Sequence, residues 1–212
     1  MAKNRIITSI ITGDIIHSRK TDNAKWLSKL RKALSMEGKT PRSWEIYRGD
    51  SFQVEVKDPI EAFHTAIRIK ATIKTIQKLD VRMAIGIGTK NFVGQKITES
   101  NGEAFIHSGE QFESLKKVKQ TLAIKTPWPE FDREMNIGFK LACIPMDEWT
   151  PSSAELVRLL THHAGLTQKS LAKRLGVSQP SVSERRNRSH YDEIMELEGL
   201  CREKIAKLIS AK

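Results

Sequence analysis

The sequence predicts an α+β fold in which a ferredoxin-like palm domain is followed by an all-α helix-turn-helix domain. Up to about residue 148, strand-like and helix-like stretches follow the order β-α-β-β-α-β and then α-β-α. From residue 152 onward every periodic stretch is helical. The first six elements match a split βαβ pattern, which builds an antiparallel sheet with helices on one face.

The N-terminal elements are recognised by the spacing of their apolar residues. Residues 5–12 form a continuous β-branched run, which is typical of a strand buried on both faces. Residues 23–36 carry apolar side chains at helical spacing. Two alternating stretches, 44–48 and 51–56, flank Gly49-Asp50 and so predict a β-hairpin. The remaining elements are a helix beginning at Asp58-Pro59, a strand over 81–88, a helix over 102–116, a short strand over 121–125 and a helix over 129–146.

A short segment rich in turn and capping residues separates the two parts. Residues 149–153 read Trp-Thr-Pro-Ser-Ser, which combines a proline with a pair of N-capping serines. We therefore expect a palm domain over 1–148, a linker over 149–153 and a helical domain over 154–212. The helices of that domain are expected over 154–163, 167–175, 178–188 and 191–209.

The second and third of these helices have the spacing of a helix-turn-helix. Counting from Gln168, the fifth residue is Ala172, at the point where the helices cross and the side chain must be small. The ninth is Gly176, in the turn, where glycine accepts a positive φ. The fifteenth is Val182, which packs the third helix onto the second. The alternative is a plain four-helix bundle that binds nothing.

The surface of these two helices favours DNA as the partner. Residues 166–188 include six basic residues and a single acidic one, Glu184, and the whole chain has a formal net charge of +11. Gln and Arg side chains can read adenine and guanine, and a helix N-terminus can hold a phosphate. Thr167 and Ser178 are the expected N-caps. The residues predicted to contact DNA are Gln168, Ser178, Gln179, Ser183, Arg186 and Asn187.

Two Gly-Asp pairs lie near each other in the predicted sheet. Asp14 follows the first strand, and Asp50 lies at the tip of the hairpin expected to pair beside it. Two carboxylates at adjacent strand ends suit Mg²⁺ or Mn²⁺ and can hold a metal against a triphosphate. The alternative is that Asp14 caps a turn or helix and Asp50 is a routine hairpin residue. The predicted site comprises Asp14 and Asp50 for the metal, with Gly13, Ile15, Arg19 and Arg48 for the phosphates.

The same stretches resemble the catalytic palm of class III nucleotidyl cyclases and, more loosely, the GGDEF diguanylate cyclases. The likeness covers residues 5 to about 116 and implies a metal-dependent palm. The chain departs from the cyclase pattern where an Asn and an Arg stabilise the transition state, since it has Ile106 and Glu110 there. It also has Ile46 in place of the base-selecting Lys. The stretches that carry the likeness are Thr12-Gly13-Asp14-Ile15, Arg48-Gly49-Asp50-Ser51-Phe52, residues 82–88 and Gly102-Glu103-Ala104-Phe105.

The whole chain resembles the SatD family of bacterial proteins, which join such a palm to a C-terminal helix-turn-helix. This resemblance implies the two-part architecture described above. It lies in Ile11-Thr12-Gly13-Asp14-Ile15-Ile16 with Ser18-Arg19, in residues 47–53, and in Val177-Ser178-Gln179-Pro180-Ser181-Val182-Ser183.

These patterns predict a cytoplasmic DNA-binding transcriptional regulator whose palm domain senses a metal-bound nucleotide or a related phosphate ligand. The alternative is an enzyme, a divergent nucleotidyl cyclase or nucleotidyltransferase with an accessory helix-turn-helix. A third interpretation makes the palm a dimerisation scaffold without a ligand. The two cysteines, Cys143 and Cys201, lack CxxC spacing and are expected to be reduced thiols in a cytosolic protein. No apolar run has transmembrane length, so no membrane partner is expected.

A homodimer is expected, because related palms complete their sites across a dimer and helix-turn-helix modules usually read paired half-sites. The last helix offers a candidate interface, for which the alternative is ordinary packing within the chain. Its apolar residues recur every three or four positions, at Ile194, Leu197, Cys201, Ile205 and Leu208.

Overall fold

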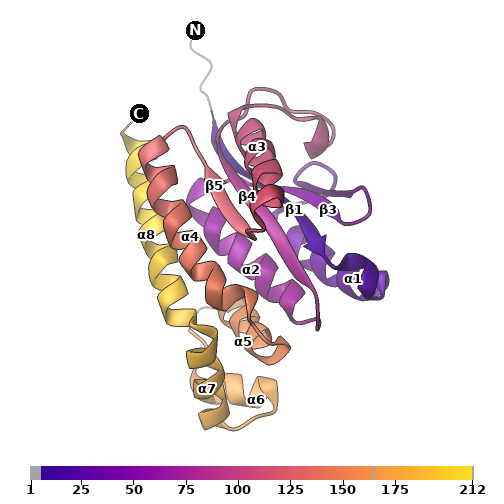
Figure 1. Cartoon of the computed structure of the whole chain (residues 1–212), viewed down its shortest axis with the longest axis vertical. Helices are drawn as coiled ribbons and strands as arrows, with labels where there is room; N and C mark the ends of the chain where they lie inside the picture. The colour runs from indigo at the N-terminus through magenta and orange to yellow at the C-terminus, as the bar shows by residue number, and fades with distance from the viewer. Residues whose placement is uncertain (1–5, 164, 212) are drawn as a thin grey trace.

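The computed structural model describes residues 6–163 and 165–211 of the chain. One five-stranded sheet has the strand order β2-β3-β1-β4-β5 and carries helices on both of its faces (Figure 1). The strands are β1 (Ile7–Ile16), β2 (Trp44–Tyr47), β3 (Ser51–Val56), β4 (Asp80–Thr89) and β5 (Leu122–Lys125). The helices are α1 (Asn23–Leu34), α2 (Ala62–Lys74), α3 (Glu103–Val118), α4 (Pro129–Asp147), α5 (Pro151–His162), α6 (Gln168–Leu175), α7 (Gln179–Ser189) and α8 (Tyr191–Ser210).

The strands and helices occur in the order that the sequence predicts, but β1 is longer than expected. It continues to Ile16, so Gly13 pairs with Phe52 on one side and Met83 on the other. A Cβ at position 13 would lie 2.5 Å from the Phe52 ring and 2.8 Å from the Arg82 carbonyl oxygen. Glycine therefore allows close packing of the strands here, and Asp14, which the sequence places after the first strand, lies within it.

The antiparallel sheet expected for the first six elements is present, since β2, β3, β1 and β4 pair antiparallel, but the later elements add a parallel strand and a helix on the other face. β4 and β5 run parallel, and parallel neighbours need a crossover connection, which α3 provides. α3 lies on the face opposite α2, where Ile10 clusters with Phe105 and the Thr12 hydroxyl lies 3.0 Å from that of Ser108. The chain therefore has three layers, with the sheet in the middle (Figure 1).

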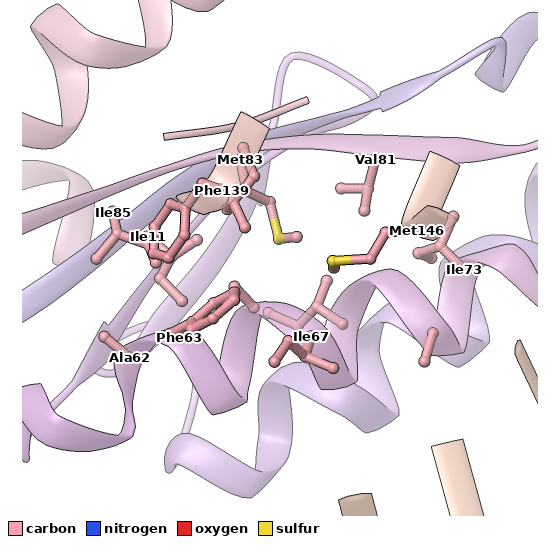
Figure 2. Packing of buried hydrophobic residues seen from close by; sticks show 14 of the residues in the cluster. Ile11, Ala62, Phe63, Ile67, Ile73, Val81, Met83, Ile85, Phe139 and Met146 are labelled. Atoms are coloured by element: carbon pink, nitrogen blue, oxygen red, sulfur yellow. The ribbon is translucent and has the colours of Figure 1, made fainter. Parts of the chain in front are cut away.

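The main hydrophobic core lies between the other face of the sheet and helices α2 and α4. Figure 2 shows Phe63 of α2 against Phe139 of α4, whose ring centroids are 4.3 Å apart. Alternate residues of the central strands point into this layer, as the pleat of a strand requires. The other residues labelled in the figure are Ile11, Ala62, Ile67, Ile73, Val81, Met83, Ile85 and Met146.

A buried ion network joins α2 to the sheet and to the end of α4. The side chain of Lys70 is completely buried, and its Nζ lies 2.7 Å from Asp80 Oδ1 and 2.7 Å from Asp147 Oδ1. The Thr121 hydroxyl donates to the same Asp147 oxygen at 2.7 Å. Opposite charges and hydrogen bonds together offset the cost of taking the ammonium group out of water.

The C-terminal helices belong to the same core as the sheet. Ala154 and Val157 of α5 cluster with the residues that α2 and α4 bury. α5 begins at Pro151, within the segment 149–153 expected as a linker, and the Thr150 side chain caps it. Trp149 is buried, and its indole N–H donates to the Ser189 carbonyl at 2.8 Å. Residues 149–153 are therefore fixed by packing on both sides.

Helix α8 lies along α4, and its apolar face turns inward (Figure 1). Ile194, Cys201 and Ile205 are buried in the chain's own core, so for these three residues the intramolecular alternative is correct and the dimer interface is wrong. No helix among residues 6–163 and 165–211 is long and apolar enough to cross a membrane.

Candidate nucleic-acid interface and ligand site

The helix-turn-helix is formed by α6 and α7 and is supported by α5. The predicted caps are confirmed, because Thr167 Oγ1 accepts from the Ser170 N–H at 3.2 Å and Ser178 Oγ accepts from the Ser181 N–H at 3.4 Å. The turn residue Gly176 has a φ of 64°, as the predicted turn requires. A small core of its own holds the pair together, and it consists of Leu156, Leu159, Leu171, Ala172 and Val182.

Five of the six predicted DNA contacts are exposed on this module. Ser178 and Gln179 lie at the start of α7, and Ser183 and Asn187 follow along the same helix. Gln168 Nε2 donates to the Gln179 carbonyl at 3.0 Å, so it fixes the start of α6 against the start of α7. α7 thus offers a row of uncharged hydrogen-bonding side chains, which suits the edges of bases in a major groove.

The sixth predicted contact, Arg186, is engaged inside the chain. Its Nη2 donates to Asp192 Oδ1 at 2.6 Å and its Nε donates to Asp192 Oδ2 at 2.9 Å. The guanidinium also lies over the Tyr191 ring, 5.3 Å from its centroid. The hydrogen bond from Arg186 lowers the pKa of Asp192. Arg186 therefore links α7 to α8, and its contact with DNA stays a prediction.

Asp14 lies within β1, on the face that α3 covers. It pairs with Ser51 of β3 and with Arg82 of β4. Asp14 Oδ2 is 3.6 Å from Arg82 Nη1, which is too long for a hydrogen bond. Asp14 Oδ1 and Arg82 Nε are both buried and have no hydrogen-bond partner among the described residues. The Asp14 carboxylate and the Arg82 guanidinium therefore each have one buried atom that makes no hydrogen bond.

The electrostatics of Asp14 reflect its partly buried position. Burial raises its pKa most, and the negative charge of Asp50 raises it further, while Arg82 and Lys116 oppose the shift. The negative charge of Asp50 therefore acts on the Asp14 carboxylate. Lys116 belongs to α3, so the site has contributions from three elements far apart in the chain.

Asp50 lies in the hairpin turn between β2 and β3, as expected. Gly49 has a φ of 87° there, which glycine adopts without strain. Asp50 Oδ2 accepts a hydrogen bond from the buried Ser18 hydroxyl at 2.6 Å, and its carbonyl accepts from the Ile15 N–H at 3.1 Å. Ser18 was not predicted, because the contact depends on how the chain leaves β1.

The four predicted phosphate contacts divide into two kinds. Gly13 lies in the β1 ladder, and the Ile15 side chain is buried in the core, so neither presents a free group to a ligand. Arg19 and Arg48 are exposed on the two segments beside Asp50. The arginines therefore remain candidates for a ligand, whereas Gly13 and Ile15 serve the fold.

The comparisons with known proteins identify a DNA-binding domain in the C-terminal part of the chain. Residues 155–188 match the family of winged helix-turn-helix DNA-binding domains. A bacterial light-regulated adenylyl cyclase of known structure is similar over 58% of this chain and 44% of its own, at 10% sequence identity and a TM-score of 0.38. The chain thus spans less than half the length of that cyclase. No curated protein matches the chain.

A long helix, α8, follows the helix-turn-helix directly. Among the described residues that follow Arg188, the chain forms helix α8 and no β-hairpin that could act as a wing. α8 returns to the sheet domain, where the Arg202 guanidinium binds Glu61 before α2. The DNA-binding module is therefore covered on this side by a helix that also packs on α4.

A metal ion at Asp14 would need ligands beyond the carboxylates of the described residues. No group of three or more His, Cys, Asp or Glu side chains within the described ranges is placed to hold a metal by itself. Mg²⁺ is commonly held by one or two carboxylates together with phosphate oxygens and waters. Asp14 offers an unpaired oxygen, and Asp50 contributes a second carboxylate nearby. The Arg82 guanidinium repels a lone cation but suits a phosphate.

Arg82 is the residue of this site that the sequence does not single out as a contact. The sequence pattern places Arg82 in a strand and Asp14 after the first strand, so it does not predict that the two are neighbours. Extending β1 to Ile16 puts Asp14 directly opposite Arg82 in the register. The alternation of charged and apolar residues around position 82 could have indicated a polar side chain next to the first strand.

Proposed function

We propose that the chain is a DNA-binding transcriptional regulator whose palm domain senses a metal-bound nucleotide or a related phosphate ligand. The winged helix-turn-helix match over residues 155–188 carries the DNA-binding part. The exposed polar row of α7 and the net charge of +11 support it. The resemblance of the chain to SatD proteins agrees with the same architecture.

Gln179→Ala tests the DNA-binding assignment. Loss of a bidentate base contact is expected to weaken specific binding by about 1–3 kcal/mol, or roughly 5- to 150-fold, and to relax the preference at one base pair. Binding is measured by fluorescence anisotropy on operator fragments selected from random DNA. Gln77→Ala, an exposed glutamine outside the module, is the matched control. Equal affinity and equal base preference in the wild type and Gln179→Ala would contradict this contact.

The palm ligand is supported by the unused atoms of Asp14 and Arg82. A carboxylate oxygen without a hydrogen-bond partner suits a metal cation, and a guanidinium nitrogen without one suits a phosphate. Arg19, Arg48 and Asp50 surround the same hairpin end. The charges on both sides therefore favour a ligand that carries both signs, such as a metal-bound nucleotide.

Asp14→Asn and Asp50→Asn are each expected to abolish Mn²⁺-dependent nucleotide binding. The amide has no charge with which to hold the cation, while its shape is almost unchanged. The fold should tolerate Asp14→Asn, because burial already disfavours the charged form of Asp14 and raises its pKa. Calorimetry with a panel of nucleoside triphosphates and Mn²⁺ provides the measurement. Glu130→Gln, an exposed carboxylate on α4, is the control, and unchanged binding in both aspartate variants would refute the site.

Sensing is favoured over catalysis by the residues of α3. Ile106, where the cyclases have a transition-state Asn, is an exposed apolar side chain. Glu110, where they have an Arg, binds the Lys125 ammonium, and this hydrogen bond lowers the pKa of Glu110. Neither residue can donate a hydrogen bond to a developing negative charge at neutral pH. A divergent cyclase or nucleotidyltransferase would need other donors, and turnover in the same nucleotide panel would support that alternative.

We further propose a homodimer. Its interface is formed by exposed apolar residues of α4, because the apolar residues of α8 first considered for it are largely buried within the chain. Ile137, Leu141 and Ile144 recur along one side of α4 and are exposed, and Leu200 of α8 is exposed as well. A two-fold dimer would place recognition helices about 34–36 Å apart, or a multiple of this distance. Light scattering at micromolar concentration tests the proposal, and a mass of 24.1 kDa, that of one chain, with and without DNA would exclude it.

A further inference from the structure

A basic hollow lies where α1 meets the first helix of the DNA-binding module. Its volume is about 220 Å³. α2 contacts both α1 and α5, so its residues form the floor between them. We call this feature the α1–α5 hollow. It is lined by Lys29 and Lys32 of α1, Thr72 of α2, and Glu155, Arg158 and His162 of α5.

The charges of the hollow do not cancel. Arg158 donates two hydrogen bonds to Glu155, at 2.9 Å from Nε and 2.6 Å from Nη2, so these two residues neutralise each other. The Lys29 ammonium donates to the neutral Thr75 hydroxyl at 2.6 Å. Lys32 is exposed and has no ion pair with any described residue. Two ammonium charges on adjacent turns of α1 therefore remain uncompensated at the mouth of the hollow.

The histidine of the hollow is half-buried beside two arginines. His162 Nδ1 lies 2.7 Å from the Arg158 carbonyl oxygen, which can only accept, so Nδ1 carries the proton. Burial lowers the pKa of His162 most, and the nearby charges of Arg68 and Arg158 lower it further, against the opposing effect of that hydrogen bond. An anion in the hollow would meet cations and hydrogen-bond donors, together with one carboxylate that is already paired.

We infer that the α1–α5 hollow binds a phosphate of the DNA backbone and extends the DNA-binding surface beyond residues 155–188 onto α1. This inference rests on the proposed DNA-binding function. α5, α6 and α7 lie at one end of the folded molecule (Figure 1). The lining residues Arg158 and His162 lie in the last turns of α5, just before the segment that leads to α6. The two uncompensated ammonium groups are exposed, which suits a polyanion passing outside better than a small ligand enclosed within.

The experiment compares the salt dependence of DNA binding in the full chain and in the double variant Lys29→Gln/Lys32→Gln. Each phosphate contact contributes about 0.9 to the slope of log K against log salt concentration. The variant is expected to make that slope shallower by about 1 and to weaken the binding of specific and non-specific sequences by a similar factor. A lysine pair with a purely structural role would change the melting temperature and leave the slope unchanged.

A matched control separates local contact from overall charge. Lys140→Gln/Lys207→Gln removes the same charge from exposed positions on α4 and α8, and its slope should equal that of the wild type. Equal slopes in both double variants would overturn the inference while leaving DNA binding intact. A second outcome would also overturn the inference. If the wild type bound inorganic phosphate without DNA, and Lys29→Gln/Lys32→Gln lost this binding but kept the wild-type slope, the hollow would be a site for a small anion. If the wild type bound no DNA, the proposed function would fail as well.

Discussion

Lys70→Met is expected to lower the free energy of unfolding by about 3 kcal/mol. Removal of one partner from a buried ion pair leaves an uncompensated charge, which costs about 3–5 kcal/mol. Here the ammonium is completely buried between Asp80 and Asp147. The lower end of the range applies for two reasons. The Asp147 side chain is 34% exposed to water, and Asp80 keeps its ion pair with Lys74, whose Nζ lies 3.5 Å from Asp80 Oδ2. Methionine fills the space of the lysine stem, so the cost arises from charge rather than from a cavity.

Urea unfolding followed by tryptophan fluorescence measures this loss. Lys140→Met, at an exposed position of α4, should change stability by less than about 0.5 kcal/mol. Adding Asp147→Asn to Lys70→Met should recover part of the loss, since it removes one of the stranded charges. A loss below about 1 kcal/mol for Lys70→Met would contradict the importance of the network.

The effect of Lys70 should also be independent of pH across the neutral range. Burial lowers the pKa of Lys70, but the charges of Asp80 and Asp147 outweigh burial and raise the pKa above its ordinary value. A raised pKa means that the stabilisation is complete below the unfolded value of about 10.4 and is lost as the pH rises through the folded value. The difference between wild type and Lys70→Met should therefore stay constant from about pH 6 to pH 9.

Gly86→Ala should destabilise the chain by about 3 kcal/mol, at the upper end of the usual cost of overpacking. A Cβ at this position would lie 2.2 Å from the Ala104 carbonyl oxygen and 2.3 Å from the Ser108 nitrogen, which are backbone atoms of α3. No side-chain rotation relieves these contacts, so α3 has to move away from β4. Such a shift would also stretch the contact between Ser108 and Thr12 on β1.

Gly109→Ala is the matched control for this prediction. Position 109 lies on the same helix, and a Cβ there meets no atom within 4 Å. Alanine favours a helix over glycine by up to about 1 kcal/mol, so this variant should be as stable as the wild type or slightly more so. Comparable melting temperatures for the two variants would show that α3 yields easily, contrary to the close packing described above.

The helix-turn-helix could be predicted in detail because its determinants are local. The small residue Ala172, the turn residue Gly176 and the packing residue Val182 lie within some 15 residues, and both caps are close in sequence to the groups they bind. Arg186 was the exception. Its partner Asp192 lies on the next helix, and a charge pattern along α7 alone does not show that the guanidinium turns back.

The candidate ligand site could be predicted only in part because its geometry depends on strand register. The hairpin around Gly49 is local and is found where the sequence predicts it, whereas Asp14 lies inside β1 and not after it. Its neighbour Arg82 is distant in sequence and becomes a neighbour through the pairing of β1 with β4. The side of the sheet that α3 covers follows from the parallel pairing of β4 and β5, which apolar spacing does not specify.

The common core of sheet and C-terminal helices limits how this DNA-reading unit can be exchanged. Many regulators are modular, so a recognition module can be excised and grafted onto another sensor. Here α5 and α8 bury apolar faces against α2 and α4, and a cut at residue 150 would expose both sides at once. Chimaeras should therefore retain the sheet and exchange only the exposed side chains of α7, which makes this chain a scaffold for altered operator preference rather than a source of a portable domain.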